Sequence, residues 1–299
     1  MSVIYPNKVE ACSGKITETW PAHSIIMRNK FLTAALFLTY SYSEAQHFAG
    51  KIIDSASKQP LKYVSIGIVG KNIGTVSDES GNFTIDLDAQ YNNDTLLASM
   101  IGYSSFKLVV SKFKEQHLFK EKQIELSIKA VNLGNVIITP NNYIIKVVGN
   151  KSRLMTVDFS TNELGGEIGT VMKIKKTPAF IQNVNFNIAS NKFDSILFRV
   201  NIYKMENGLP GVSILNEPIL VTTKMHKGTL SIDLKKYNLY VDDNFFVSLE
   251  WIKDLGKKPL VFGGGLSGQP SYMRITSQGT WDKLPLLRLG FYATVLYQK

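Results

Sequence analysis

The chain has 299 residues, of which 44% are hydrophobic, 11% aromatic and only 19% charged. This apolar content excludes a disordered chain, because it supplies enough surface to offset the entropy cost of folding. The low charge and the many Asn, Ser, Thr, Ile, Val, Phe and Tyr residues favour an all-β protein. The formal net charge of +10 does not indicate nucleic-acid binding, because Lys and Arg are spread along the chain rather than gathered in one stripe.

Residues 27–45 have the pattern of a secretory signal peptide. Arg28 and Lys30 precede an apolar run over 31–40, and small residues stand at both ends of Ser43–Ala45. The apolar run is too short to span a bilayer, which takes about 20 residues. We therefore expect cleavage after Ala45 and a mature chain without a transmembrane segment, exported to the periplasm, the cell surface or the medium.

Residues 1–26 precede this segment and contain the chain's single cysteine, Cys12. We interpret them as the product of an upstream start codon, with Met27 as the true start. The mature chain would then have no cysteine, which excludes disulfides, thiol catalysis and Cys-based zinc sites. Gln46 follows the expected cleavage site where a lipoprotein would need cysteine, so we do not expect a lipoprotein.

Residues 48–140 alternate between apolar and polar side chains in short runs separated by turns, which indicates a small β-sandwich. The expected strands lie at 48–53, 64–69, 74–76, 83–87, 94–100, 107–110, 122–128 and 135–138. The polar stretch 112–122, with His117, is expected to be a loop. Asp78–Asn82 is expected to be a β-turn rather than a calcium loop, because no acid follows at the spacing that calcium requires.

Short motifs in this region resemble those of the carboxypeptidase regulatory-like domain. They are Gly50–Asp54, Pro60–Ile66, Gly74–Asp78, Gly81–Phe83, Asp94–Leu96 and Ile101–Tyr103. The resemblance implies a prealbumin-like β-sandwich, found in exported Gram-negative proteins as an accessory domain without a zinc site of its own. In the chain after residue 45, no histidine has an acid three residues on, as a peptidase zinc motif would require.

A second β-sandwich, jelly-roll-like, is expected over 150–299, with the domain boundary near residue 150. Its expected strands lie at 169–174, 180–188, 195–204, 218–222, 228–234, 244–252, 260–262, 271–276 and 290–296. Residues 198–203 interleave polar and apolar side chains, which predicts a sheet with one solvated face. Residues 207–211 are expected to be a turn, and Gly263–Gly268 a loop that matches neither a nucleophile elbow nor a phosphate loop. Asp242 and Asp243 are expected in a solvated turn.

Three aromatic residues, Trp251, Tyr272 and Trp281, are the candidate ligand-binding residues. Flat rings suit sugars, and neighbouring Asp and Asn side chains can bind hydroxyls, although most aromatics in a β-sandwich belong to its core. The C-terminal half is also loosely similar to secreted carbohydrate-binding-like sandwiches. No catalytic or metal-ligating constellation and no cofactor motif is present in the sequence.

These observations favour an exported, non-enzymatic envelope protein that binds a partner or a ligand, with a glycan among the candidates. The regulatory-like domain would be the scaffold, and the basic charge would favour anionic ligands. Two alternatives stay open: a divergent hydrolase or accessory subunit of a peptidase, and a purely structural assembly module that uses exposed sheet edges. Two carboxylates or a His–carboxylate pair converging in one pocket would favour the enzyme, whereas an aromatic platform without them would favour binding.

Overall fold

The computed structural model describes residues 46–119, 123–129, 143–160 and 163–298. The expected signal peptide, the residues before it with Cys12, and the strand expected at 135–138 lie outside the described residues. The described part of the chain contains 22 strands, one α-helix and two short 3-10 helices, η1 (Ala89–Tyr91) and η2 (Lys235–Tyr237). The all-β fold class is confirmed. Among the described residues, no helix combines the length and the apolar character needed to cross a membrane.

The first seven strands form two small sheets, in the orders β4-β1-β7 and β3-β2-β5-β6. Phe48 and Ile52 from the first sheet and Ile66 and Leu96 from the second share one buried core. The two sheets therefore make the expected small β-sandwich. Their strands are β1 (Gln46–Asp54), β2 (Ser65–Ile68), β3 (Gly74–Val76), β4 (Asn82–Leu87), β5 (Thr95–Ser99), β6 (Phe106–Val109) and β7 (Gln123–Leu126).

Helix α2 (Val110–Phe119) replaces the loop that the sequence predicts over 112–122. Val110 and Phe113, three residues apart, are both fully buried in the core of the first sandwich. The Phe113 ring lies 5.9 Å from that of Phe48 on β1. The prediction was wrong because two buried side chains on one face of the segment stabilise a helix whose remaining residues are mostly polar.

The turn expected at Asp78–Asn82 is confirmed. The Asp78 carboxylate accepts hydrogen bonds from the backbone N–H groups of Ser80 and Asn82, both at 2.8 Å. Gly81 has a φ of 77°, which a residue with a side chain adopts only with strain. A Cβ at Gly81 would also lie 2.6 Å from the carbonyl oxygen of Ile52. The Asp78 carboxylate thus closes its own turn.

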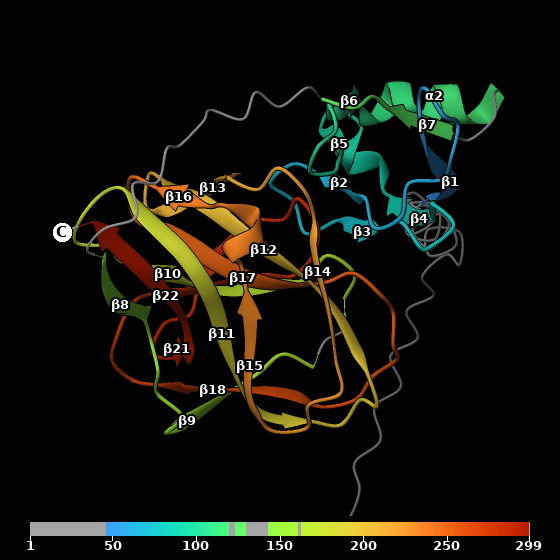
Figure 1. Cartoon of the computed structure of the whole chain (residues 1–299). Coiled ribbons are helices and arrows are strands. Elements are labelled where there is room, and N and C mark those ends of the chain that lie inside the picture. The colour runs from blue at the N-terminus through green and yellow to red at the C-terminus, as the bar shows by residue number, and fades with distance from the viewer. Residues whose placement is uncertain (1–45, 120–122, 130–142, 161–162, 299) are drawn as a thin grey trace, which may run out of the picture. The chain divides into compact units, whose positions relative to one another are not determined.

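The remaining strands form a sheet of seven strands and a sheet of eight, which run from the green β8 and β9 through yellow to the red C-terminal strand in Figure 1. The larger sheet begins with β8, which pairs with the last strand, β22, so it includes residues just before position 150. The strands are β8 (Tyr143–Gly149), β9 (Met155–Asp158), β10 (Glu167–Met172), β11 (Ala179–Asn191), β12 (Ile196–Glu206), β13 (Leu209–Ser213), β14 (Ile219–Thr223), β15 (Gly228–Asp233), β16 (Tyr240–Val241), β17 (Phe245–Trp251), β18 (Leu260–Gly265), β19 (Ser271–Arg274), β20 (Asp282–Lys283), β21 (Arg288–Leu289) and β22 (Phe291–Gln298).

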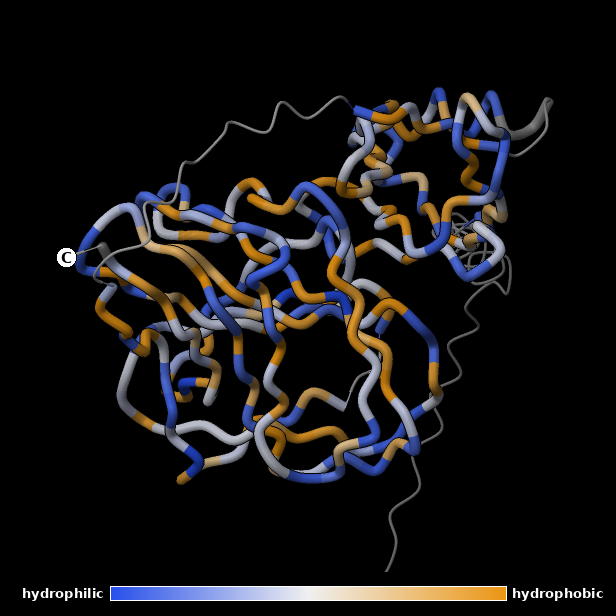
Figure 2. Tube along the Cα trace, viewed as in Figure 1, coloured by the Kyte–Doolittle hydropathy of each residue, from blue (hydrophilic) through white to orange (hydrophobic). Residues whose placement is uncertain are grey.

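The core of this second sandwich lies between the two sheets. Phe198 and Trp251 come from the seven-stranded sheet, Phe186 and Phe291 from the eight-stranded one, and all four side chains are fully buried. The Phe186 and Phe291 rings meet edge to face at 4.7 Å. The switching between apolar and polar residues along many of these strands is visible in Figure 2, and it places the apolar side of those strands in this core.

Two segments of the second sandwich differ from expectation. The turn expected over 207–211 is confined to Asn207 and Gly208, with φ values of 51° and 80°, and β13 resumes directly after it as in a tight hairpin. Gly263–Gly265 belong to strand β18 rather than to a loop. A Cβ at Gly264 would lie 2.4 Å from the Arg288 carbonyl oxygen, so glycine here permits a close approach of strands. Asp242 and Asp243 are exposed at a bend, as expected.

A pair of glycines on β2 and β3 lets the first sandwich contact the backbone of residues 276–279. Gly67 and Gly74 are opposite each other in the antiparallel pair, and a Cβ on either would lie 2.3 Å from the Ser277 carbonyl oxygen. Next to this contact, the Gly70 N–H donates to the carbonyl of Gln278 at 2.9 Å. Because these two positions carry no side chain, the backbone of residues 276–279 packs directly against β2 and β3.

Replacing Gly67 by alanine is expected to lower the free energy of unfolding by about 1–3 kcal/mol, because the added methyl group cannot fit without moving backbone. Urea denaturation would measure this change. Val69→Ala, at a half-exposed side chain in the same hairpin, is the control and is expected to change stability by about 0.5 kcal/mol or less. An unchanged midpoint for Gly67→Ala would contradict the contact with Ser277.

Candidate functional site

The outer face of the seven-stranded sheet carries a row of four charged residues on four adjacent strands. Arg199 on β12 is directly opposite Glu250 on β17. Glu250 is opposite Glu167 on β10, and Glu167 is opposite Arg274 on β19. The order across the sheet is therefore Arg, Glu, Glu, Arg. Because each carboxylate has an arginine on its outer side, the two adjacent negative charges are both compensated.

This face is not solvated, contrary to the expectation from residues 198–203. Arg199 is 5% exposed, Asn201 3%, Glu250 1% and Glu167 0%. The first sandwich contributes to the cover, because the carbonyl of Tyr63 and the hydroxyl of Ser65 both accept hydrogen bonds from the Arg199 guanidinium. The interleaved polar residues thus mark a second buried face rather than a wet one.

All of the oxygens of the two carboxylates are occupied. Glu250 accepts from Arg199 Nη2 at 2.7 Å and Nε at 2.8 Å, from Asn201 at 2.7 Å and from Ser65 at 3.2 Å. Glu167 accepts from Asn201 at 2.9 Å, from Tyr203 at 3.2 Å, and from Arg274 and Ser248. The Asn201 amide thus bridges the two carboxylates, and each carboxylate oxygen accepts two hydrogen bonds.

These contacts determine the charge states at the centre of the row. Burial disfavours ionisation of Glu250, but the charge and hydrogen bonds of Arg199 outweigh it and lower the pKa of the carboxyl. Burial and the Glu167 carboxylate raise the pKa of the Tyr203 phenol well above its ordinary value. Glu250 is therefore ionised and Tyr203 neutral at neutral pH.

The two arginines differ in how many of their guanidinium nitrogens donate hydrogen bonds. Arg199 donates from Nε, Nη1 and Nη2. Within the described residues, Arg274 donates only from Nη2, to Glu167 and to the Tyr203 hydroxyl, and its Nε is buried without a partner. The Trp281 ring lies over its guanidinium at 4.8 Å and holds it by a cation–π contact. The guanidinium of Arg274 is thus held in a fixed orientation, and some of its N–H groups donate no hydrogen bond within the described residues.

A cavity of about 670 Å³ opens onto this row, which is within the usual size range of small-molecule sites. Its walls combine hydroxyl and amide groups with apolar side chains from both sandwiches. They include Ser65, Leu97, Ser99, Met100, Ile101, Tyr103, Lys129, Arg199, Asn201, Tyr203, Val212, Leu215, Asn216, Glu250, Arg274 and Gln278. Arg274 lines the cavity and its side chain retains 12% exposure. Its Nε is buried, so of its donors without a partner among the described residues Nη1 is the one that a ligand could reach.

The three aromatic residues singled out from the sequence do not line this cavity. Trp251 is fully buried in the core on the opposite face of the sheet, where its ring packs 5.1 Å from that of Phe198. Tyr272 and Trp281 are brought together around Phe246, at 6.1 and 5.1 Å, and the Tyr272 hydroxyl donates to the Gly208 carbonyl. Of the three, Trp281 touches the charged row, through Arg274.

No described part of the chain gathers three or more His, Cys, Asp or Glu residues that could hold a metal ion. His47 pairs with Asp86 at 2.7 Å on the surface, and Nδ1 of His226 lies 3.0 Å from the carbonyl oxygen of Asn191. The two carboxylates of the row have their oxygens filled by arginine, amide and hydroxyl donors. The polar groups that this site presents are arginine, amide and hydroxyl side chains, which can form hydrogen bonds and recognise charge.

Sequence reasoning missed the four charged residues of the row. A signal was present in residues 245–251, which read Phe-Phe-Val-Ser-Leu-Glu-Trp. Such a strand has apolar residues on both faces, and a single carboxylate in it can be buried only with a partner of opposite charge. The partner itself could not be identified, because Arg199 lies 51 positions away and only the strand register brings it opposite Glu250.

Comparisons with known proteins confirm the resemblance of the first sandwich. Residues 48–138 match the family model of the CarboxypepD_reg-like domain. None of the curated proteins matches the chain.

Two solved structures show a distant likeness. The cysteine protease and lectin-like domains of Cwp84, a surface layer associated protein of Clostridium difficile, are 9% identical with a TM-score of 0.39. That comparison covers 86% of this chain, which spans 59% of the Cwp84 chain. The infectious bursal disease virus Gx strain structure is 8% identical with a TM-score of 0.26, covering 85% of this chain and 71% of the other. Likeness at this level carries no argument about function.

Proposed function

We propose that this chain is an exported, non-enzymatic binding protein of the cell envelope, and that its ligand occupies the cavity beside Arg274. The observation that carries the proposal is Arg274 itself, a nearly buried arginine in the cavity wall with unused donors and a fixed orientation. An arginine held in this way is suited to recognise a ligand oxygen. The regulatory-like domain would act as scaffold and as one wall of the site.

The state of the carboxylates supports binding over hydrolysis. Glu167 and Glu250 do converge, which is the arrangement that a hydrolase would need. A general acid must carry a proton and a general base must have a free lone pair aimed at the substrate. Here the Glu250 pKa is lowered and the hydrogen bonds of both side chains point into the protein. The two carboxylates are therefore better suited to hold Arg199 and Arg274 in place than to transfer protons.

The chemistry of the walls favours a ligand that carries a carboxylate. Arg274 and Lys129 are both among the residues that line the cavity, and the chain is basic overall, so an anion is attracted to it. Asn216 and the serine hydroxyls suit sugar hydroxyls, whereas Leu97 and Met100 suit the apolar face of a sugar ring. We therefore favour an acidic glycan fragment. The match of residues 48–138 to a family typical of extracellular proteins supports export.

Calorimetric titration with uronic-acid oligosaccharides and their neutral counterparts would test this proposal. We expect the acidic forms to bind more tightly, and Arg274→Gln to weaken that binding about tenfold or more, because a charge-assisted hydrogen bond contributes about 1.5–3 kcal/mol. Arg274→Lys keeps the positive charge but loses the planar guanidinium, so an intermediate loss is expected.

Arg153→Gln removes the same charge at an exposed position outside the cavity and is the matched control. Circular dichroism would show whether each variant is folded. Equal binding of acidic and neutral oligosaccharides, no binding of either, or an unchanged affinity in a folded Arg274→Gln variant would each contradict the proposal.

A further inference from the structure

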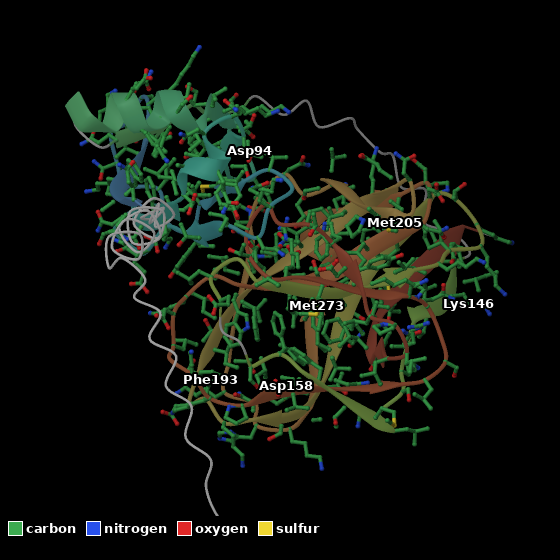
Figure 3. All side chains as sticks on the ribbon, turned by 180° about the vertical axis from the view of Figure 1, so that it is seen from behind. Asp94, Lys146, Asp158, Phe193, Met205 and Met273 are labelled. Atoms are coloured by element: carbon green, nitrogen blue, oxygen red, sulfur yellow. The ribbon has the colours of Figure 1, made fainter. Side chains whose placement is uncertain are left out.

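A second hollow, of about 370 Å³, lies at an edge of the eight-stranded sheet. Strand β8 forms this edge, and within the described residues it pairs with β22 alone. Over residues 144–148, its other side pairs with no described strand, so it presents backbone N–H and C=O groups that an added strand could use. Figure 3 shows Lys146, at the middle of β8, on the margin of the second sandwich. The hollow shares no residue with the cavity beside Arg274.

Four lysines surround this hollow. Lys146 comes from β8, and Lys173, Lys175 and Lys176 come from the segment after β10; all four are exposed. Among the residues that the structure describes, no acidic side chain lines the hollow and none of these lysines takes part in an ion pair. The repulsion among them is therefore relieved only by ions from solution or by an anionic partner.

The same edge also exposes apolar side chains. Ile145 is 65% exposed and Val147 43%, and Ile144 and Tyr297 line the hollow. A lysine in an edge strand commonly protects it against pairing, and Lys146 alone would serve that purpose. Protection explains neither the exposed Ile145 and Val147 nor the three further lysines from a different segment.

We propose that β8 is a docking edge for an extended, acidic segment of a partner protein. The segment would pair with the backbone of β8, place its carboxylates among the four lysines, and cover Ile145 and Val147. A second copy of this chain does not fit, because it would bring the same lysines to the contact. The recognition would be β-strand addition, in which the backbone supplies affinity and the side chains supply specificity.

The test uses a labelled peptide of alternating Glu and Val residues, as long as β8, at low ionic strength. We expect it to bind in fluorescence anisotropy and to slow amide hydrogen exchange over residues 143–149. A version with methylated backbone nitrogens keeps the charge but cannot pair as a strand, so it is expected to bind at least tenfold more weakly. A Lys/Val peptide is expected not to bind.

Replacing Lys173, Lys175 and Lys176 by glutamine is expected to weaken binding about tenfold and to reduce its dependence on salt, because each exposed ion pair contributes modestly. The matched control replaces three exposed lysines elsewhere, Lys204, Lys224 and Lys227, by glutamine and is expected to bind as the parent does. Equal binding of the methylated peptide would show attraction to polyanions in general and would overturn the proposal, as would absence of binding by the Glu/Val peptide.

Discussion

Glu250→Ala is expected to lower the free energy of unfolding by about 3–5 kcal/mol, because it leaves Arg199 charged, buried and without its counterion. Arg199 is 5% exposed and also holds Tyr63 and Ser65 of the first sandwich. The loss should therefore extend to the contact between the two sandwiches. Chemical denaturation followed by circular dichroism measures the free energy of unfolding.

The double variant Arg199→Met/Glu250→Leu is the control for this prediction. It removes both charges and fills the space with apolar groups, so it is expected to cost less than the sum of the two single variants. Lys58→Ala, which breaks an exposed pair with Glu125 at 2.7 Å, is expected to cost about 1 kcal/mol or less. A loss of similar size for Glu250→Ala and Lys58→Ala would contradict the buried row.

The same carboxylate determines how stability should change with pH. The pKa of Glu250 is lower in the folded protein than its ordinary value of 4.5. Its contribution to stability is thus complete above that ordinary value and is lost as pH falls through the folded pKa. Glu250→Gln is therefore expected to flatten the loss of stability below pH 4.5. Urea denaturation at neutral pH and at several acidic pH values would measure this change. If the free energy of unfolding of Glu250→Gln falls below pH 4.5 as steeply as that of the parent, Glu250 is not the group responsible.

Local sequence patterns were sufficient to predict many of the strands. Strand β4 is an example, because Phe83, Ile85 and Leu87 alternate with exposed polar residues and are all buried. The same reasoning failed for α2, where polar side chains along 112–122 concealed the buried Phe113. Two buried apolar residues that anchor a short helix are a tertiary effect, and they leave little periodic signal in the sequence.

The candidate site could not be predicted from the sequence for a different reason. Polar residues on a strand usually face solvent, so the pattern of residues 198–203 predicts that Arg199 and Asn201 are solvated. Their burial depends on the first sandwich, which covers this face, and their partners depend on the register of β12, β17, β10 and β19. Neither the cover nor the register is encoded by residues that are near each other in the sequence.

Trp251→Ala is expected to destabilise the second sandwich by about 3–5 kcal/mol, the usual cost of removing a large buried aromatic ring. Its ring has no exposed surface and lies 5.1 Å from Phe198, 5.5 Å from Phe193 and 5.8 Å from Phe159. The surrounding rings come from separate strands and segments, so they cannot close the gap easily. Thermal or chemical unfolding would measure the loss.

Trp281→Ala is the comparison for Trp251→Ala. The sequence predicts both tryptophans as ligand-binding residues, and they differ in what surrounds them in the structure. Trp281 is half-buried, so its removal is expected to cost less stability than that of Trp251, on the order of 1 kcal/mol. It would release the guanidinium of Arg274 from its cation–π contact at 4.8 Å and so weaken binding of an acidic ligand. Trp251→Phe, which keeps a ring in the core, should leave that binding unchanged. The opposite outcome, with affinity lost in Trp251→Phe and kept in Trp281→Ala, would contradict the placement of the ligand beside Arg274.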